Sequence, residues 1–539
     1  MMKRTVWLIA LSLLSLTLSA SDSLRVHNPQ IPVLLDRIDN VLFQIRVPDA
    51  RPGDVLESLT VEFGPDTDLK AIAELRLFYS GTEAASRKGL RFSPVEYISA
   101  HNVWNTRSAN PAYSVMQEQN LKIGRKVVLH SRQPMVGGIN YYWVSVRMNP
   151  EASLLTELRA KVSEVVIGGK KVTVACDSKD VVRRMGYGVR HAGDDHSMAY
   201  RIPGLVTTNS GSLIGVYDVR WNNSADLQER IDIGVSRSTD KGQTWEPMRI
   251  AMSFAGVDGL PAGQNGVGDP AVLVDESTGT IWAVAVWTHG MGNGRAWTNS
   301  MPGMEPIETP QLMLARSDDD GRTWSKPINI TKQVKDPSWC FLLQGPGRGI
   351  TMRDGTLVFA IQFIDKDRMP HAGIMYSKDH GETWHIHNPA RSNTTEAQVA
   401  EVEPGVLMLN MRDNRGGARA VMTTRDLGRT WVEHVSHRTS LREPVCMASL
   451  IAVPAEKNVL GKDLLLFSNP DTTDGRYNIT IKASLDGGIT WPCKLLLDEG
   501  NSWGYSCLTM IDSQTVGILY ESSTAHITFQ AVKLDDIVK

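Results

Sequence analysis

Five aspartates recur at one position of a repeated sequence pattern, and carboxylates gathered in this way could supply acid and base catalysis. The pattern reads Ser/Thr-x-Asp-x-Gly-x-Thr-Trp and occurs five times, at residues 238–245, 317–324, 377–384, 424–431 and 484–491. The aspartates are Asp240, Asp319, Asp379, Asp426 and Asp486. Five matches to a pattern with five specified positions are not a chance event. The elements that carry these side chains decide whether they share one site.

The residues of the pattern have a local structural explanation. Ser and Asp side chains accept backbone N–H groups inside a turn, and Gly adopts the positive φ that such turns need. The Thr and Trp that follow favour a strand, where Trp supplies a large packing surface. Each copy is therefore predicted to be a hairpin turn followed by a strand. Repeat symmetry places each aspartate on its own unit, so we interpret all five as structural rather than catalytic.

The spacing of the copies indicates the fold of the larger part of the chain. Successive aspartates are 79, 60, 47 and 60 residues apart, and apolar strands such as 213–217 and 357–361 lie between the copies or before them. Repeats of about 40–60 residues built from short strands are typical of a β-propeller. About 350 residues at about 58 per blade give about six blades, so one blade is expected to lack the pattern.

The region before the propeller has a different character. Short alternating segments, among them 41–47, 74–79 and 140–146, are separated by Pro-Gly turns and predict an antiparallel β-sandwich. Residues 152–165 fit either a short helix or a pair of strands. The polar stretch with Gly186, Gly188 and Gly193 is interpreted as a linker. The sandwich is placed at 21–180 and the propeller at 188–539.

The first twenty residues predict a signal peptide. Lys3 and Arg4 precede an apolar run over 6–18, and Leu18-Ser19-Ala20 resembles a cleavage site after small residues. The run is too short to cross a membrane, so no transmembrane anchor is expected. We expect an exported protein, periplasmic or secreted, whose mature chain begins near Ser21 and is a monomer.

Composition excludes several classes of partner and cofactor. Lys and Arg number 57 against 59 Asp and Glu, a formal net charge of −2, which argues against nucleic acid or an anionic membrane surface as the main partner. The 5 cysteines form no CxxC pair and no Cys/His metal spacing, so neither a metal site nor another cofactor is predicted. Residues 345–349, Gly-Pro-Gly-Arg-Gly, lack the Lys-Ser/Thr pair of a phosphate-binding loop, and we expect a blade turn there.

The repeated pattern resembles the Asp boxes of sialidases (neuraminidases). Residues 200–205, Tyr-Arg-Ile-Pro-Gly-Leu, resemble the Arg-Ile-Pro motif that opens the catalytic domain of that family. The resemblance covers about residues 195 to 535, or two-thirds of the chain. It implies an all-β protein, with a six-bladed β-propeller catalytic domain preceded by a β-sandwich accessory domain. That accessory domain would bind carbohydrate or brace the propeller, and its sequence does not decide between the two.

The same resemblance implies a triad of arginines. Arg201 lies in the Arg-Ile-Pro motif, Arg412 follows the apolar strand 406–411, and Arg476 precedes another at 477–481. A sialic acid carries a carboxylate on its anomeric carbon, and planar guanidinium groups bind carboxylates in a bidentate manner. These three side chains are therefore expected to gather at the mouth of the propeller and hold the substrate carboxylate.

A tyrosine is the implied nucleophile. A carboxylate nucleophile would be repelled by the substrate carboxylate, whereas a neutral phenol would not, and sialidases are known to use tyrosine. Tyr505 matches the tyrosine of the family. With an unperturbed pKa of about 10 it needs a base partner. Glu396 matches the glutamate of the family in that role, and Glu401 is the rival, five residues further on.

The implied acid/base is Asp226, in a loop that also carries Arg220 as a helper. It would protonate the leaving oxygen and then activate water. Asp218 and Asp232 are the nearby competitors for this role. Asp269 resembles a residue that contacts the hydroxyl groups of the sugar ring.

The resemblance thus implies a retaining exo-α-sialidase that acts on terminal sialic acids of glycoconjugates through a covalent sialyl-tyrosine. An N-acetyl pocket would need apolar walls, and Trp287 is a candidate for one, although a core position fits it equally well. The alternative from another class is a non-catalytic Asp-box propeller that binds glycan or protein. Trans-sialidases and intramolecular lyases would use the same residues, so the sequence does not separate them from a hydrolase.

Overall fold

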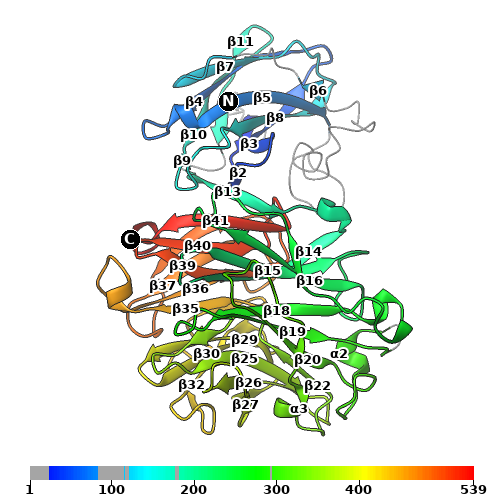
Figure 1. The fold of residues 1–539 in the computed structure, drawn as a ribbon. Helices are drawn as coiled ribbons and strands as arrows, with labels where there is room; N and C mark the ends of the chain where they lie inside the picture. Colours follow the sequence, from blue (N-terminus) through cyan, green and yellow to red (C-terminus); the bar gives the residue numbers. More distant parts are fainter. Residues whose placement is uncertain (1–22, 83–113, 116–120, 177–180, 292–293) are drawn as a thin grey trace, which may run out of the picture.

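The computed structural model describes residues 23–82, 114–115, 121–176, 181–291 and 294–539, and it shows an all-β chain in two parts (Figure 1). The predicted signal peptide lies outside the described residues. Among the described residues the α-helices are three single turns: α2 (Ala296–Asn299), α3 (Thr331–Val334) and α4 (Leu534–Ile537). Single 3-10 turns occur in the loops: η1 (Leu69–Ala71), η3 (Asp194–His196), η4 (Val257–Gly259), η5 (Ala262–Gln264) and η6 (Ala455–Lys457).

The first part is the predicted β-sandwich. One sheet has the strand order β12-β1-β3-β8-β5-β6 and the other β11-β10-β4-β7, and their apolar faces pack on each other. The strands are β1 (Leu24–His27), β3 (Asn40–Ala50), β4 (Leu56–Phe63), β5 (Ile72–Gly81), β6 (Ser114–Val115), β7 (Lys126–His130), β8 (Gly138–Met148), β10 (Ala160–Ile167), β11 (Lys170–Lys171) and β12 (Val174–Cys176). The three segments predicted from alternation lie in β3, β5 and β8. The open stretch 152–165 forms β9 (Glu157–Leu158) and the start of β10.

The second part contains seven sheets among the described residues, and the six larger ones are the blades of the predicted propeller. Blades 1 to 3 are β14 (Ala199–Thr207), β15 (Leu213–Arg220), β16 (Ile231–Ser238), β17 (Arg249–Met252); β18 (Val267–Val274), β19 (Ile281–Trp287), β20 (Gln311–Ser317), β21 (Ile328–Asn329), with β23 (Gly347–Arg348) beside β18; and β22 (Phe341–Gln344), β24 (Ile350–Thr351), β25 (Leu357–Ile364), β26 (Pro370–Ser377), β27 (His385–Ile386), with β28 (Arg391–Ser392) beside β26.

Blades 4 to 6 repeat the plan. They are β29 (Thr394–Glu403), β30 (Val406–Asp413), β32 (Ala420–Thr424), β33 (Val432–Glu433); β35 (Ser449–Val453), β36 (Leu464–Pro470), β37 (Ile479–Ser484), β38 (Cys493–Asp498); and β39 (Ser506–Asp512), β40 (Thr515–Tyr520), β41 (Ile527–Lys533), β13 (Arg183–Arg190). The small pair β31 (Gly417–Ala418) and β34 (Arg442–Glu443) joins blades 4 and 5. The innermost strands contact one another in a ring, and β39 packs against β14, so the ring closes.

The sixth blade corrects one prediction. The stretch with Gly186 and Gly188 is not a linker but belongs to β13, which pairs with β41 and with β2 (Val33–Leu34). A Cβ on Gly186 would lie 3.2 Å from the carbonyl oxygen of Phe529, so glycine allows this close pairing. The linker prediction was wrong because the strand that pairs with this segment, β41, lies more than 300 residues away in the sequence. The sixth blade lacks an Asp box because its outermost strand comes from the other end of the propeller sequence.

The sandwich and the propeller share one apolar cluster, which includes Leu158 of β9, Met185 of β13 and Phe529 of β41. Polar contacts reinforce the junction. Gln243 of the first Asp box donates from Nε2 to the carbonyl oxygen of Ala152 at 2.7 Å. This packing supports the bracing role for the sandwich, and its carbohydrate-binding role stays a prediction.

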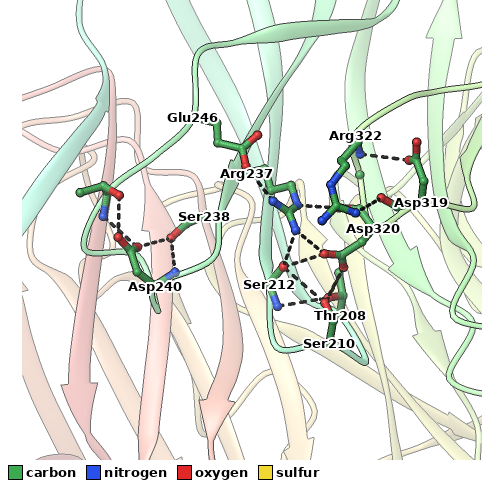
Figure 2. Close-up of polar contacts among 12 residues, drawn as sticks. Thr208, Ser210, Ser212, Arg237, Ser238, Asp240, Glu246, Asp319, Asp320 and Arg322 are labelled. Carbon is green, nitrogen blue, oxygen red and sulfur yellow. Dashed lines mark hydrogen bonds and ion pairs between the residues drawn. The ribbon is translucent and has the colours of Figure 1, made fainter.

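The Asp boxes form the predicted turns (Figure 2). In the first box, Asp240 accepts the backbone N–H of Thr244 at 2.9 Å and the hydroxyl of Ser238 at 2.8 Å. Gly242 has a φ of 89°, and a Cβ there would lie 2.0 Å from the ring of Phe529 in the preceding blade. The glycine is therefore required both by the turn and by the contact between blades.

The boxes also connect neighbouring blades. Asp320 of the second box accepts hydrogen bonds from the hydroxyls of Thr208, Ser210 and Ser212, in the first turn of blade 1. Arg237 of β16 donates to it as well (Figure 2). Burial acts to raise the pKa of Asp320, but the hydrogen bond from Arg237 and those from the hydroxyls lower it well below its usual range. These carboxylates therefore have a structural role, because their hydrogen bonds stabilise the turns and connect neighbouring blades.

The Gly-Pro-Gly-Arg-Gly segment corrects a second prediction, because it is not a turn at the edge of a blade. Its Gly347 and Arg348 form β23, which follows β22 in the chain and pairs in parallel with β18 of blade 2. A Cβ on Gly345 would lie 2.3 Å from the carbonyl oxygen of Ala397, and one on Gly204 would lie 2.4 Å from that of Gly347. The glycines thus let three innermost strands approach near the propeller axis.

Candidate active site

Strand direction assigns opposite roles to the two faces of the propeller. Each innermost strand begins on one face, and successive antiparallel strands alternate in direction. The turn from the third to the fourth strand, which carries the Asp box, therefore lies on the face where the innermost strand ends. The predicted site residues lie at innermost-strand starts or near the second-to-third-strand loops, so the topology collects them on the other face. The five box aspartates are thus separated from the site.

Backbone irregularities aim three of the predicted residues at the centre of that face. The pairing of β14 with β15 shifts between Arg201 and Gly204, where Ile202 has a φ of 59°. The pairing of β18 shifts across Asp269, whose φ is 57°. The pairing of β29 shifts across Glu396. Such bulges redirect a side chain out of the alternation of its strand, which explains the Arg-Ile-Pro motif physically.

Tyr505, immediately before β39, pairs with Glu396. Its hydroxyl donates a very short hydrogen bond to Glu396 Oε1. Arg412, at the end of β30, donates from Nη1 to Glu396 Oε2 at 2.7 Å and to the Tyr505 hydroxyl at 3.3 Å. Burial, and then the Glu396 carboxylate, raise the pKa of Tyr505 well above its usual range. The phenol is therefore neutral and has one acceptor positioned to take its proton.

All three predicted arginines surround this tyrosine. The guanidinium carbons of Arg201 and Arg476 lie 5.2 and 5.7 Å from the centroid of the Tyr505 ring, and Arg412 contacts its hydroxyl. Arg476 donates to the carbonyl oxygens of Trp503 at 2.9 Å and Val445 at 3.4 Å, and within the described part of the chain it makes no ion pair. Positive charge therefore gathers around one phenol.

Glu521 is a site residue that the sequence reasoning missed. It lies just after β40 and is fully buried. Its Oε1 accepts from Arg201 Nε and from the backbone N–H of Ile202, each at 3.0 Å, and its Oε2 accepts the backbone N–H of Tyr505 at 3.0 Å. One carboxylate thus positions an arginine of the triad and the tyrosine. The only sequence signal was an acidic residue directly after the apolar strand 515–520.

Asp226 and Arg220 occupy the side of the site nearest blade 1. Arg220 is buried and donates from Nη1 to Asp226 Oδ1 at 2.8 Å, and Arg201 Nη1 lies 3.5 Å from the same oxygen. The Asp226 side chain keeps half of its surface exposed. Burial acts to raise its pKa, but Arg220 and then Arg201 lower it below the ordinary value.

The rivals from the sequence have structural contacts. Asp218 accepts two hydrogen bonds from Arg220, at 3.0 and 2.8 Å, and also the backbone N–H of Asp269. Asp232 accepts from the indole of Trp221 at 2.7 Å. Glu401 lies at the other end of β29, about 16 Å of strand from Glu396, and accepts the backbone N–H of Arg353. None of the three lines the cavity described next.

A cavity of about 300 Å³ opens between these groups. Five of the predicted residues line it: Asp226, Asp269, Glu396, Arg412 and Tyr505. Burial, and then the charge of Asp218, raise the pKa of Asp269 well above its usual range, so its carboxyl can donate as well as accept a hydrogen bond. A pocket of this size accommodates one monosaccharide unit.

The apolar wall of the cavity is not Trp287. That side chain stacks on Phe254 with centroids 4.6 Å apart and belongs to a core cluster between blades 1 and 2. The wall comes instead from Leu227, Trp297 and Phe341, with the two aromatic rings packed edge to face. The core alternative for Trp287 therefore holds.

Among the residues described here, no group of three or more His, Cys, Asp or Glu side chains is arranged to hold a metal, and no helix is long and apolar enough to cross a membrane.

Two protein-family models match the chain. The N-terminal domain of BNR-repeat neuraminidase matches residues 21–171, and the BNR repeat-like domain matches residues 219–518. The first corresponds to the sandwich, and the second spans most of the propeller, including all five Asp boxes.

Individual relatives agree with these matches. A sialidase from Bacteroides fragilis (strain YCH46) is 60% identical over 524 residues, which cover 96% of this chain and 96% of that protein. The solved structure of Hadza microbial sialidase Hz136 is 90% identical, covers 95% of this chain and 100% of its own, and superposes with a TM-score of 0.91. A sialidase from Micromonospora viridifaciens is 34% identical over 60% of this chain and 50% of that protein. This chain therefore belongs to the bacterial sialidase (neuraminidase) family, and with it to the glycoside hydrolases.

Proposed function

We propose that this protein is an exo-α-sialidase that hydrolyses terminal α-linked sialic acids of glycoproteins, glycolipids or oligosaccharides with retention of configuration. The observation that carries the proposal is the hydrogen-bonded pair of Tyr505 and Glu396, which three arginines surround. A carboxylate-bearing sugar matches this charge, and the rim of the cavity supplies Asp226 as a proton donor.

The arginines bind the substrate carboxylate in this mechanism. Arg476 contributes the charge that no acidic side chain in the described structure neutralises, while Arg201 and Arg412 share theirs with Glu521 and Glu396. Charge-assisted, bidentate contacts fix the orientation of the anomeric carbon. The carboxylate then lies beside Tyr505, a neutral nucleophile that it does not repel.

The first chemical step forms a glycosyl-enzyme. The Tyr505 oxygen attacks the anomeric carbon while its proton passes to Glu396, and the bond to the leaving oxygen breaks as Asp226 delivers a proton to it. In the second step Asp226 removes a proton from water, which attacks the anomeric carbon, and the tyrosine oxygen leaves and regains its proton from Glu396. Two displacements at one carbon give net retention.

Asp226 must be protonated to act as an acid, and in this mechanism the bound substrate raises the pKa of Asp226. Arg220 and Arg201 hold the pKa of Asp226 low when the site is empty, which favours the carboxylate rather than the acid. A substrate carboxylate that binds Arg201 offsets part of this positive charge and adds a negative charge nearby. The pKa of Asp226 then rises in the complex, which favours the protonated form that the first step needs.

The test is a fluorogenic sialoside assay combined with NMR of the sugar product. We expect fluorophore release, and sialic acid that appears first as the α-anomer. Absence of turnover by folded protein would favour the non-catalytic propeller. An anhydro-sugar product would replace the hydrolase by an intramolecular lyase, and transfer to an added sugar acceptor would replace it by a trans-sialidase.

We also propose that the protein is exported and acts as a monomer. The basic, apolar and small-residue segments of the first twenty residues support export. Intact mass measurement of protein recovered from the periplasm or medium should show a chain that begins near Ser21. A mass that includes Met1 would refute the cleavage.

A further inference from the structure

The propeller has a second cavity, on the face opposite the candidate active site. It measures about 840 Å³ and lies where the first turns of the blades converge around the axis. No residue lines both this cavity and the one that contains Tyr505. Its volume lies in the range of small-molecule pockets. We refer to it as the axial pocket.

Arg348 of β23 is the principal cation of the axial pocket. Its Nη1 donates to the carbonyl oxygen of Leu508 and to the hydroxyl of Thr509, and its Nε donates to the carbonyl oxygen of Gly349, each at 3.3 Å. No carboxylate pairs with it among the described residues, and burial lowers its pKa. The side chain is partly exposed at the wall of the pocket, so its charge is accessible to a ligand there.

The acidic side chains of the axial pocket are already engaged. Glu276 pairs with Lys457 at 3.1 Å, and Asp512 pairs with Lys241 at 2.7 Å. Glu401 accepts the backbone N–H of Arg353 at 2.7 Å.

The remaining acidic residue, Asp354, accepts the backbone N–H of Thr356 at 2.9 Å. Arg353 also lines the pocket, and within the described structure its guanidinium makes no ion pair. Within the described structure, neither Arg348 nor Arg353 therefore makes an ion pair, and Glu401 and Asp354 are bonded to backbone N–H groups.

In the glycine-rich segment, Arg348 lies between two glycines that have no space for a side chain. Gly347 has a φ of 107°, and a Cβ there would lie 2.7 Å from Met447. A Cβ on Gly349 would lie 2.6 Å from the carbonyl oxygen of Val358. Side chains are thus excluded on both sides of the arginine. The segment that looked like a phosphate-binding loop in the sequence supplies a side-chain cation instead of a backbone cradle.

We propose that the axial pocket binds a small ligand through an oxyanion, either a carboxylate or a phosphate group, with Arg348 as the main donor and Arg353 as the second. The Thr509 hydroxyl beside Arg348 adds a neutral donor. The pocket acts independently of sialic acid cleavage, so the proposal does not depend on the proposed function.

Anomalous diffraction from crystals soaked in selenate locates the site. We expect selenium within hydrogen-bond distance of the Arg348 guanidinium. Selenate found only among Arg201, Arg412 and Arg476, or nowhere in the propeller, would overturn the proposal.

Calorimetric titrations with inorganic phosphate and, separately, with glucuronate identify the source of the oxyanion. We expect Arg348→Gln to weaken binding of at least one probe by about tenfold or more, as expected for loss of a charge-assisted contact. Arg353→Gln should weaken it less. Lys326→Gln, which removes an exposed positive charge outside the pocket, is the matched control and should bind as the unmodified protein does.

Equal affinity of Arg348→Gln and the unmodified protein for both probes contradicts the proposal. Selenium at Arg348 without binding of either probe in solution identifies an adventitious ion only and also overturns it. Should Arg348→Gln fail to fold, Arg348→Lys and Arg353→Gln decide, since the first keeps the charge but loses the fork and the second changes a side chain with no ion pair.

Discussion

The two faces of the propeller use similar residues for different purposes. On the Asp-box face, carboxylates such as Asp240 and Asp320 accept hydrogen bonds from their own turn or from the neighbouring blade. On the opposite face, Asp226 and Glu396 accept from Arg220 and Arg412, and both carboxylates line a cavity. Residue type therefore does not distinguish a structural aspartate from the proposed acid/base, Asp226.

Strand direction makes the distinction. The third residue of each Asp box, such as Asp240, accepts from donors a few residues away in its own turn. A carboxylate on the other face meets groups from several blades, since the innermost strands all begin there. The Glu396 contacts come from Arg412 and Tyr505, which lie on blades 4 and 6. The comparison teaches that groups converging from several blades, and not local density of charge, mark the site.

The largest expected effect comes from removing the hydroxyl of Tyr505. Removing a tyrosine hydroxyl on the Asp-box face provides the comparison. Tyr505→Phe should lower kcat by at least about a thousandfold, because the nucleophile is lost. Tyr376→Phe is the matched control, since among the described residues that hydroxyl bonds only to His387, at 2.9 Å near the third box. Steady-state assays with a fluorogenic sialoside, together with thermal unfolding, measure both. A Tyr505→Phe enzyme with near-normal kcat would refute the assignment.

A smaller loss should distinguish the two ends of β29. Glu396→Gln should lower kcat by about 10²- to 10³-fold, because the proton of Tyr505 loses its acceptor. Glu401→Gln alters a carboxylate that caps backbone N–H groups on the other face, so its kcat should remain within about twofold of normal. The two variants are compared under identical assay conditions. Equal losses would break the distinction between the faces.

Asp226→Asn should show an effect that depends on the leaving group. The loss should reach about 10²-fold or more for an alkyl-linked sialyl oligosaccharide, whose leaving oxygen needs a proton, and should be much smaller for an aryl sialoside of low leaving-group pKa. Asp218→Asn tests the rival. That variant disturbs Arg220 and should affect both substrates alike. The same ratio of losses for both variants would argue against Asp226 as the acid.

Replacing one arginine on each face should distinguish a direct contact with the substrate from a general effect of the net charge of the protein. Arg476→Gln should lower kcat/KM by about 10- to 100-fold, because a charge-assisted contact with the substrate carboxylate is worth about 1.5–3 kcal/mol. Arg322→Gln changes a box arginine that donates to the carbonyl oxygen of Asp319 and should leave kcat/KM unchanged. A salt titration of kcat/KM should confirm that the effect is local. Equal losses would show that net charge matters instead.

The smallest effect on activity should come from Asp320→Ala. We expect a loss of about 1–3 kcal/mol in the free energy of unfolding and no change in kcat, since blades 1 and 2 lose a shared acceptor. The lowered pKa of Asp320 fixes the sign of the pH dependence. Its contribution is complete above the unfolded-state pKa of about 3.9 and is lost as pH falls through the lower folded-state value. Unfolding measured at neutral and acidic pH tests this, and a lost kcat without lost stability would contradict it.

Much of the propeller architecture was predictable because it depends on sequence patterns that repeat within a few residues. The Asp boxes repeat a turn whose hydrogen bonds lie within a few residues, so the blade count followed from spacing. The linker prediction over Gly186 and Gly188 failed because β13 pairs with a strand at the far end of the chain. The turn prediction at Gly345 and Gly347 failed because those glycines serve contacts between blades.

The candidate site divides in the same way. Arg201, Glu396 and Tyr505 were identified by motif, and the structure brings them together. Glu521 was missed because a carboxylate that orients other groups carries no motif of its own. The apolar wall depends on which loop reaches the cavity, and the sequence did not show that Trp297 rather than Trp287 lies there.

Trapping the glycosyl-enzyme tests the central claim most directly. A sialosyl fluoride that carries a second fluorine beside the anomeric carbon should accumulate the intermediate, and proteolysis with mass spectrometry should locate it. The mechanism predicts one adduct, on the peptide that contains Tyr505 and on its phenolic oxygen, with none in Tyr505→Phe. An adduct on Glu396 or Asp226, or turnover without any adduct on Tyr505, would contradict the mechanism.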